Sequence, residues 1–378
     1  MVKLASTLPN PEHPFDGTSY RLVRSLARGG MGQVFLVEHR RLGRQLVAKL
    51  LHDELASNPQ LVDRFRIEAQ SLGRLKHPNI VSIFGFEATR NNRPFMITEY
   101  LQGRTIAQEL ASGTVFSVRE AIRYTREALA ALAAAHELGI VHRDIKPQNL
   151  MLQELPDGSK KLKVLDFGLA RVIPGISLRA PQPLNVPTDT GVVFGTPRFV
   201  SPEAALGQHV DHRADIYGVG LILYVMLARR GPFDHASGHV GAMTAHLTEA
   251  PEPPSKYSPV PVPIELDAIV LKALDKNKDA RIQTAQEFDT LLASMAKALA
   301  SGIVSSIRVV AKTVDRTASN NQAEPTSEAD GRLELPVTGD LDSKPGRTGR
   351  LLYAGLTLFA ALLVFIIGYL VLVKRGVP

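Results

Sequence analysis

Three polar residues with complementary chemistry lie close together between Ile140 and Leu152. Asp144, Lys146 and Asn149 follow one another at intervals of two and three residues. Transfer of a phosphoryl group requires a positioned acceptor hydroxyl, compensation of phosphate charge and a held metal ion. In this stretch, Asp144 can orient a hydroxyl and accept its proton, Lys146 can neutralise a γ-phosphate, and Asn149 can ligate Mg²⁺. The pattern therefore predicts a phosphoryl-transfer loop.

A second acidic residue follows at the end of the next expected hairpin. The turn of that hairpin is marked by Pro156-Asp157-Gly158, and its second strand is predicted over Leu162–Leu165. This strand leads into Asp166-Phe167-Gly168, where Asp166 is the natural second metal ligand. The loop with Asp144 itself lies between an Ala-rich helix, expected over 119–138, and a short strand.

A glycine-rich turn, Ala27 to Val34, joins two expected strands over 20–26 and 34–38. Glycine has no Cβ and adopts positive φ freely, so such a turn can bring its backbone amides close to phosphates. An ordinary hairpin turn explains this segment equally well when it is taken alone.

A lysine stands at the end of the apolar strand predicted over Leu46–Leu50. A charged side chain such as that of Lys49 is energetically unfavourable in an apolar strand unless it has a partner. Glu68, in a helix predicted over 61–75, is the obvious partner. Such an ion pair would direct the ammonium toward polyphosphate oxygens. The alternative is a lysine that extends to solvent from an edge strand, with Glu68 on a solvated helix face.

In combination, these motifs resemble the protein-kinase fold, and within it the bacterial, eukaryotic-like serine/threonine kinases. The resemblance covers about Tyr20 to Met295. Besides the motifs above, it is carried by Lys76-His77-Pro78-Asn79-Ile80-Val81, Glu99-Tyr100-Leu101, Gly195-Thr196-Pro197, Ser201-Pro202-Glu203, Asp211 to Tyr217 and Arg281. It implies an α+β, bilobal fold, with a small antiparallel sheet plus the Glu68 helix and a larger, mainly helical lobe. It also implies that Glu203 and Arg281 form a structural ion pair and that Asp215 braces the catalytic loop.

The resemblance implies ATP with Mg²⁺, for which Mn²⁺ is an accepted substitute. Lys49 would steady the α- and β-phosphates, Asn149 and Asp166 would hold the metal, and Asp144 would serve the acceptor hydroxyl. Thr98 would be the gatekeeper behind the nucleotide, and Glu99 to Leu101 the interlobe hinge. The residues expected around ATP are Ala27, Arg28, Gly29, Gly30, Met31, Gly32, Val34, Ala48, Lys49, Thr98, Glu99, Leu101 and Asp166, and the catalytic set is Asp144, Lys146, Asn149, Lys49 and Glu68.

The resemblance also indicates the acceptor. Lys146 together with Thr196 follows the pattern of kinases that act on Ser/Thr rather than Tyr. Arg143 precedes Asp144, as in kinases controlled by phosphorylation of the activation segment, so Thr188 and Thr190 are candidate phosphorylation sites. The alternative for either Thr is a solvated loop residue. Two departures from the family pattern are Ala27, in place of the first loop glycine, and Ser201, where alanine is commoner.

Composition restricts the alternatives. The 378 residues are 44% hydrophobic and 21% charged, with a net charge of +7 whose Lys and Arg are scattered, so we expect a solvated surface and no nucleic-acid partner. Cysteine is absent, which excludes disulfides and Cys-based metal sites. The N-terminal segment lacks the apolar stretch of a signal peptide, so we do not expect one.

The sequence predicts five regions: an N-terminal extension over 1–19, a kinase domain over 20–300, a flexible linker over 301–350, a transmembrane helix over 351–373 and a short tail over 374–378. The uncharged run 351–373 would form a helix about 34 Å long, enough to cross a hydrocarbon core of about 30 Å. The alternative is a buried helix of a soluble domain. Because the kinase domain needs ATP, we expect a single-pass membrane protein with that domain in the cytoplasm and no second globular domain beyond the span.

Two other functions are compatible with parts of the pattern. A small-molecule phosphotransferase would share the Asp/Asn/Asp chemistry but would lack the segment from Gly195-Thr196-Pro197 to Ser201-Pro202-Glu203. A non-catalytic membrane scaffold would be expected to have lost Lys49, Asp144 or Asp166. The expected partners are therefore ATP, proteins that bear Ser/Thr and the membrane. A homodimer is a further possibility, through which activity could be regulated.

Overall fold

The structure is a computed structural model that describes residues 14–29, 32–60, 62–63, 66–67, 73–167 and 197–302. Two units are distinguished, 1–315 and 316–378, and all described residues belong to the first. Within the described parts of the chain, no helix is long and apolar enough to cross a membrane. Residues 351–373, where the sequence predicts a span, lie outside them, as does most of the helix expected over 61–75.

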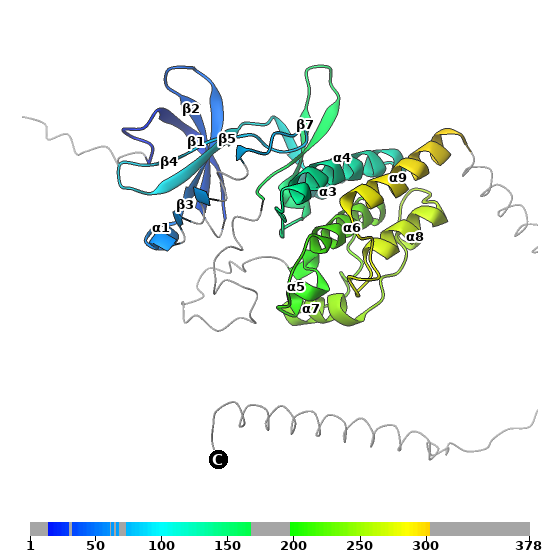
Figure 1. The fold of residues 1–378 in the computed structure, drawn as a ribbon. Coiled ribbons are helices and arrows are strands. Elements are labelled where there is room, and N and C mark those ends of the chain that lie inside the picture. The colour runs from blue at the N-terminus through cyan, green and yellow to red at the C-terminus, as the bar shows by residue number, and fades with distance from the viewer. Residues whose placement is uncertain are drawn as a thin grey trace, which may run out of the picture. The chain divides into compact units, whose positions relative to one another are not determined.

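The small lobe is built on a five-stranded antiparallel sheet in the order β1-β2-β3-β5-β4 (Figure 1). Residues of four strands, β1, β2, β3 and β5, form its core together with Phe15, and Val37, Ala48, Leu50 and Ile97 in it are fully buried. The strands are β1 (Tyr20–Arg28), β2 (Gly32–His39), β3 (Gln45–Leu51), β4 (Ile83–Ala88) and β5 (Pro94–Glu99). The short helix α1 (Asp53–Ala56) follows β3. The three strands expected near 20–26, 34–38 and 46–50 are confirmed, each slightly longer than the pattern indicated.

The larger lobe is mainly helical and carries a second, three-stranded sheet in the order β6-β7-β8. Its strands are β6 (Gly103–Thr105), β7 (Leu150–Glu154) and β8 (Lys160–Val164). Its helices are α3 (Ile106–Ala111), α4 (Val118–Glu137), α5 (Pro202–Ala205), α6 (Arg213–Ala228), α7 (Gly238–Thr248), α8 (Ile264–Ala273) and α9 (Ala285–Ala300), with 3₁₀ turns η1 (Pro147–Asn149), η3 (Pro197–Phe199) and η4 (Pro254–Lys256).

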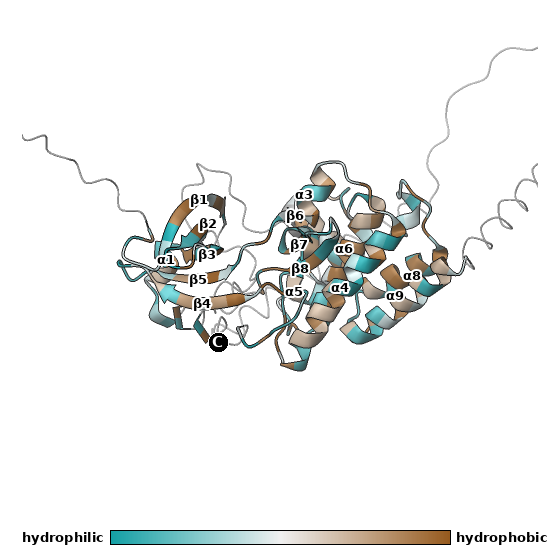
Figure 2. Ribbon diagram, turned by 90° about the horizontal axis from the view of Figure 1, so that it is seen from above, coloured by the Kyte–Doolittle hydropathy of each residue, from teal (hydrophilic) through white to brown (hydrophobic). Residues whose placement is uncertain are grey.

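Helix α4 begins one residue before the predicted position and ends one residue before the predicted end. Ser117 and Glu120 form a reciprocal capping box at its start, which satisfies two backbone donors and fixes that boundary. Its apolar side, with Leu129 and Leu132 fully buried, packs against α6 and α9. Polar and apolar residues accordingly alternate along α4 and α9 in Figure 2.

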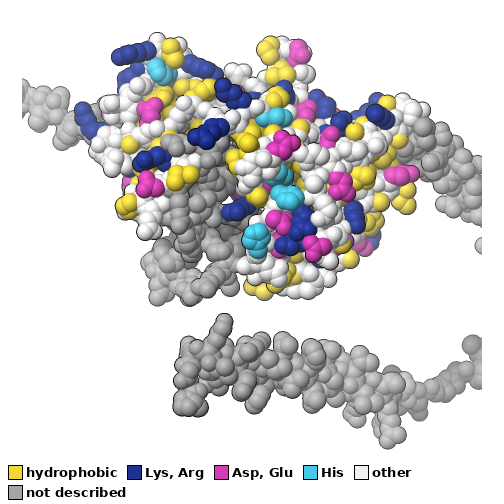
Figure 3. Space-filling view, in the orientation of Figure 1, with side chains coloured by type: hydrophobic (Ala, Val, Ile, Leu, Met, Phe, Trp, Pro, Cys, Tyr) yellow, Lys and Arg dark blue, Asp and Glu magenta, His cyan; other side chains and the backbone are white. Residues whose placement is uncertain are grey.

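Helix α6 is the buried centre of the large lobe. Every residue from Asp215 to Ala228 is buried, and no charged residue follows Asp215 within the helix. A Cβ at Gly218 would lie 2.9 Å from the side chain of Ile145, so glycine there lets α6 approach the loop that carries Asp144. On the face shown in Figure 3, Lys and Arg side chains are interspersed with Asp and Glu over the surface.

Candidate active site

The three residues first singled out in the sequence converge on one carboxylate. Lys146 Nζ lies 2.7 Å from Asp144 Oδ2, and Asn149 Nδ2 donates to the same oxygen at 3.0 Å and to the Asp144 carbonyl at 2.7 Å. These contacts fix the orientation of the Asp144 side chain. That side chain is 36% exposed, so an acceptor hydroxyl can reach it.

Asp215 of α6 holds the backbone of this loop from behind, as the resemblance implied. One of its oxygens accepts from the Arg143 amide and the other from the His142 amide, both at 2.8 Å. His136 of α4 approaches that second oxygen at 2.8 Å. Arg143 has φ of +62°, a left-handed conformation unusual for a residue with a Cβ. The buried carboxylate of Asp215 stabilises it.

His142 connects the loop to the strand that delivers Asp166. Its Nδ1 accepts from the Asp144 amide at 3.2 Å, so the neutral ring carries its proton on Nε2. Nε2 then donates to the Leu165 carbonyl at 2.9 Å. The ring also packs against Phe167, with centroids 4.7 Å apart. One buried histidine thus sets the spacing between the Asp144 loop and Asp166.

Lys49 and Asp166 form an ion pair between the two lobes, with Nζ 2.9 Å from Oδ1. Burial alone would raise the pKa of Asp166, but the charge of Lys49 and its hydrogen bond, with a smaller contribution from the charge of Lys146, outweigh burial and hold the pKa below its usual value. Asp166 is therefore an anion. Glu68, the expected partner of Lys49, lies outside the described residues.

The described ends of the glycine-rich turn, Gly29 and Gly32, are joined by a backbone hydrogen bond at the start of β2. The Gly29 amide donates to the Gly32 carbonyl at 2.9 Å, and the Gly29 carbonyl lies 2.7 Å from His52 Nε2. A Cβ at Gly32 would lie 2.0 Å from the Leu50 carbonyl oxygen, so glycine is required where the start of β2 pairs with the end of β3. Ala27 pairs with Val34 across this turn. Gly30 and Met31, the expected phosphate-covering residues at its tip, lie outside the described residues.

The expected hinge residues lie at the end of β5. Thr98 and Leu101 are buried. Glu99 uses its backbone amide to donate to Ser82 at 3.0 Å, and its carboxylate accepts from the Ser82 amide and from Lys163 Nζ, each at 2.8 Å. Burial raises the pKa of Glu99, but the hydrogen bonds from Lys163 and Ser82 outweigh burial and lower the pKa overall.

Three residues that contribute to this arrangement were not identified from the sequence: His52, His136 and Lys163. Lys163 had a detectable signal, because it is a lysine within the buried strand β8, just as Lys49 is within β3. His52 and His136 carry no such signal, since each is an isolated histidine whose neighbours come from distant parts of the chain.

The donor set fits a divalent cation of the Mg²⁺ type. Asp166 offers an anionic oxygen, and Asn149 donates through Nδ2, which leaves its amide oxygen as a ligand. Within the described residues there is no group of three or more His, Cys, Asp or Glu arranged to hold a metal. Mg²⁺ commonly takes only one or two protein oxygens and completes its shell with phosphates and water, so a two-oxygen set suits it.

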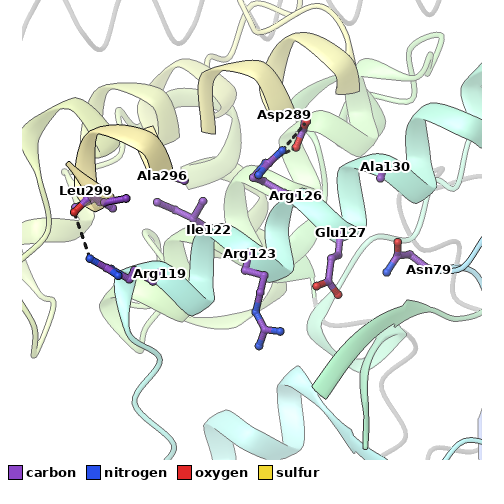
Figure 4. A pocket seen from close by; sticks show the side chains of 11 residues that line it. Asn79, Arg119, Ile122, Arg123, Arg126, Glu127, Ala130, Asp289, Ala296 and Leu299 are labelled. Carbon is purple, nitrogen blue, oxygen red and sulfur yellow. Dashed lines mark hydrogen bonds and ion pairs between the residues drawn. The ribbon is translucent and has the colours of Figure 1, made fainter. Parts of the chain in front are cut away.

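A separate hollow of about 470 Å³ lies between α4 and α9, with Ile122, Ala296 and Leu299 among its lining residues (Figure 4). Its arginines are engaged locally: Arg126 Nε lies 2.7 Å from Asp289, and Arg119 donates to the Leu299 carbonyl at 3.2 Å. None of the sequence-predicted site residues lines it. The hollow is therefore distinct from the candidate active site.

Comparison with known proteins agrees with the fold. The sequence matches the protein kinase domain family over residues 20–292. The chain therefore belongs to the protein kinase family, and the relatives to which it is similar are bacterial serine/threonine-protein kinases.

The relatives include serine/threonine-protein kinase Pkn1 of Myxococcus xanthus, 40% identical over 278 residues, which are 72% of this chain and 38% of that protein. PknB of Mycolicibacterium smegmatis is 38% identical over 283 residues, 74% of this chain and 43% of that protein. The chain thus spans about two fifths of the length of these relatives. The solved kinase domain of Mycobacterium tuberculosis PknI has a TM-score of 0.56 at 24% identity, over 77% of this chain and 99% of that one, which shows the shared fold.

Proposed function

We propose that this protein transfers the γ-phosphoryl group of ATP to serine or threonine hydroxyls of proteins. The observation that carries the proposal is that Lys146 and Asn149 both contact the same carboxylate oxygen of Asp144. His142 connects this loop, through the Leu165 carbonyl, to the strand end that precedes Asp166. A phosphoryl transfer needs a base, a cation and a metal-binding oxygen in one place, and these residues supply all three.

In the proposed reaction, the acceptor oxygen forms a bond to the γ-phosphorus while the bond from that phosphorus to the bridging oxygen of ADP breaks. Asp144 orients the hydroxyl and takes its proton. Lys146 offsets the charge on the transferred group, and Lys49 steadies the α- and β-phosphates. Asn149 and Asp166 would hold the divalent ion, which neutralises phosphate oxygens when bound.

The direct test is phosphate transfer by the full chain from γ-labelled ATP to casein, with Mg²⁺ present. Asp144→Asn should abolish transfer, because its amide cannot accept the proton. Asp157→Asn, the same change in the exposed hairpin turn, should leave transfer intact. ATP binding without transfer by the parent protein would favour the scaffold interpretation instead.

Phosphorylation of Thr188 or Thr190 is proposed to activate the enzyme. Both lie outside the described residues, but Arg143 is exposed beside Asp144 and can pair with a phosphate. Mass spectrometry after incubation with ATP should find phosphate on at least one of them. Changing both to valine should lower the rate of casein phosphorylation, whereas Thr290→Val on the exposed face of α9 should not.

We further propose that residues 351–373 anchor the protein in a membrane, with the kinase domain in the cytoplasm and residues 301–350 as linker. The chain has no cysteine, so single cysteines can report sidedness. In intact cells, an impermeant maleimide should label Val377→Cys and not Ala5→Cys. Recovery of the protein in the soluble fraction would contradict the anchor while leaving the proposed activity untouched.

A further inference from the structure

The turn between β2 and β3 presents an exposed leucine among arginines. Leu42 is 72% exposed, and Arg40, Arg41 and Arg44 on either side of it are exposed too. We call residues 39–44 the hairpin tip. In Figure 3, Lys and Arg side chains gather along the upper edge of the small lobe. A solvated surface usually mixes charges of both signs, so a group of cations around one apolar side chain indicates a binding surface.

Hydrogen bonds fix the backbone of the hairpin tip. His39 Nδ1 accepts from the amides of Arg41 and Leu42, each at 3.3 Å. The His39 carbonyl accepts from the Gly43 amide at 2.9 Å, and Gly43 has φ of +63°, which glycine adopts freely. The His39 ring packs edge-on against buried Tyr20, with centroids 5.5 Å apart. The fold therefore holds Leu42 exposed before any partner binds, so little order has to be gained on binding.

The charges of the hairpin tip are largely uncompensated. Arg40 lies 3.8 Å from Asp16, and such a long contact between two half-exposed groups contributes little. Arg44 lies 4.6 Å from the centre of the Phe84 ring, which is itself 49% exposed, so its contact is with an aromatic face. Among the ion pairs of the described residues, none involves Arg41 or Arg44. Two guanidinium groups are thus available to an anionic partner.

We propose that the hairpin tip is a docking surface for a membrane that contains anionic lipids. Headgroup phosphates and carboxylates accept hydrogen bonds from guanidinium groups, and the boundary of the acyl chains takes up exposed leucine side chains. Each arginine near such a surface strengthens binding about fivefold. A nucleic acid would satisfy the cations but offers no apolar layer for Leu42. The inference requires neither the proposed kinase activity nor the proposed anchor.

An ordinary solvated turn makes a different prediction. Its arginines would stay in water, so neither the charge of nearby lipids nor the loss of the arginines would change its surroundings. A docked hairpin tip instead comes within reach of groups attached to the lipid acyl chains, and it does so only when the membrane carries negative charge. Added salt weakens this contact, because it screens the attraction between the arginines and the lipid.

The chain has no cysteine, so a single introduced cysteine can report on the hairpin tip. Gln45→Cys, at the exposed start of β3, keeps Leu42 and the arginines and is labelled with an environment-sensitive dye. The full chain is mixed with phosphatidylcholine vesicles that carry brominated acyl chains and either no phosphatidylserine or about 30% of it. Quenching of the dye should be at least about threefold greater with the anionic vesicles. A dye on Ile264→Cys, a 75% exposed residue before Glu265, is the matched reporter and should respond equally to both kinds of vesicle.

Variants of the labelled protein separate charge from apolar contact. Arg41→Gln/Arg44→Gln should reduce the quenching with anionic vesicles to the level seen with neutral ones. Leu42→Ser keeps the cations, so the dye should respond more weakly but remain sensitive to lipid charge. Arg104→Gln/Lys272→Gln removes two exposed cations from the large lobe and is the matched control, which should quench like the parent.

Equal quenching with both kinds of vesicle, or quenching that survives in Arg41→Gln/Arg44→Gln, would overturn the inference. A dye response to polyuridylate and not to vesicles would also overturn it, by assigning the hairpin tip to a nucleic acid. Co-sedimentation with neutral vesicles tests the proposed anchor separately. A chain that sediments with them, but whose dye at the tip is not quenched more by anionic vesicles, has an anchor and no docking tip.

Discussion

Lys163 of β8 and Glu99 at the end of β5 form a buried ion pair, with Nζ 2.8 Å from Oε1 and both side chains less than a fifth exposed. Lys163 also donates to the Ile80 carbonyl at 3.3 Å, and the Val164 amide that follows donates to Asn79 at 2.8 Å. The pair thus joins the expected hinge, the segment before β4 and the strand that leads to Asp166. The relative placement of the lobes depends on it.

Lys163→Met should destabilise the protein by about 3 kcal/mol, because it leaves the Glu99 carboxylate buried without its cation. The thermal midpoint, followed by circular dichroism, should fall by roughly 6–12 °C. Adding Glu99→Gln should restore part of the loss, since the double variant has no unpaired charge. Arg21→Met, which breaks the exposed pair with Glu38, should cost less than about 1 kcal/mol. Equal losses at the two sites would contradict the structural importance of the Lys163 pair.

The sequence predicted the chemistry of the site better than its mechanical support. Asp144, Lys146 and Asn149 are close in sequence, so their spacing alone indicated that they act together. Glu203 and Arg281 were paired through the family resemblance, and the two hydrogen bonds of 3.0 Å between them confirm that prediction. The contacts of Lys163 with Glu99 and of His246 Nδ1 with Tyr217 Oη, each 2.8 Å long, were not predicted. They join residues far apart in sequence, and only the packing of the lobes brings them together.

Asp215→Asn should lower kcat about 10–100-fold with little change in KM for ATP, because the geometry of the Asp144 loop would be lost. Both carboxylate oxygens of Asp215 are acceptors, one for Arg143 and the other for His142 and His136. Asparagine has one acceptor oxygen, so its amide group would face a donor. Steady-state kinetics checks this expectation, with Asp289→Asn at the surface as control. A kcat within twofold of the parent would show that the left-handed conformation of Arg143 does not require both carboxylate oxygens of Asp215.

The stability of the protein should fall as the pH is lowered from about 6.5 to about 4, in part through His246. Burial and Lys276 lower the pKa of His246 to about 4, so the unfolded chain binds this proton at higher pH than the folded chain does. The stability that neutral His246 contributes is complete above its unfolded pKa of about 6.5, and it declines by at most about 1.4 kcal/mol per pH unit below it.

Thermal unfolding of the parent and of His246→Gln, measured at several pH values across this range, isolates the contribution. Other groups titrate equally in both proteins, so the difference between their unfolding free energies should shrink steadily toward low pH. A difference that is independent of pH would mean that the folded state tolerates a protonated His246.

Gly32→Ala should raise KM for ATP and lower the thermal midpoint, because the new methyl group has no space. Its Cβ would lie 2.0 Å from the Leu50 oxygen and 2.8 Å from the Leu50 carbonyl carbon, both backbone atoms that cannot rotate away. Either β2 shifts relative to β3 or the turn at Gly29 opens, and both changes move the amides proposed to contact phosphate. We expect a destabilisation of about 1–3 kcal/mol.

Gly85→Ala in β4 is the matched control, since a Cβ there meets no atom within 4 Å. If both variants bind ATP like the parent, the approach of β2 to β3 does not control the nucleotide site. A selective rise in KM at Gly32 would tie the packing of the two strands directly to ATP binding.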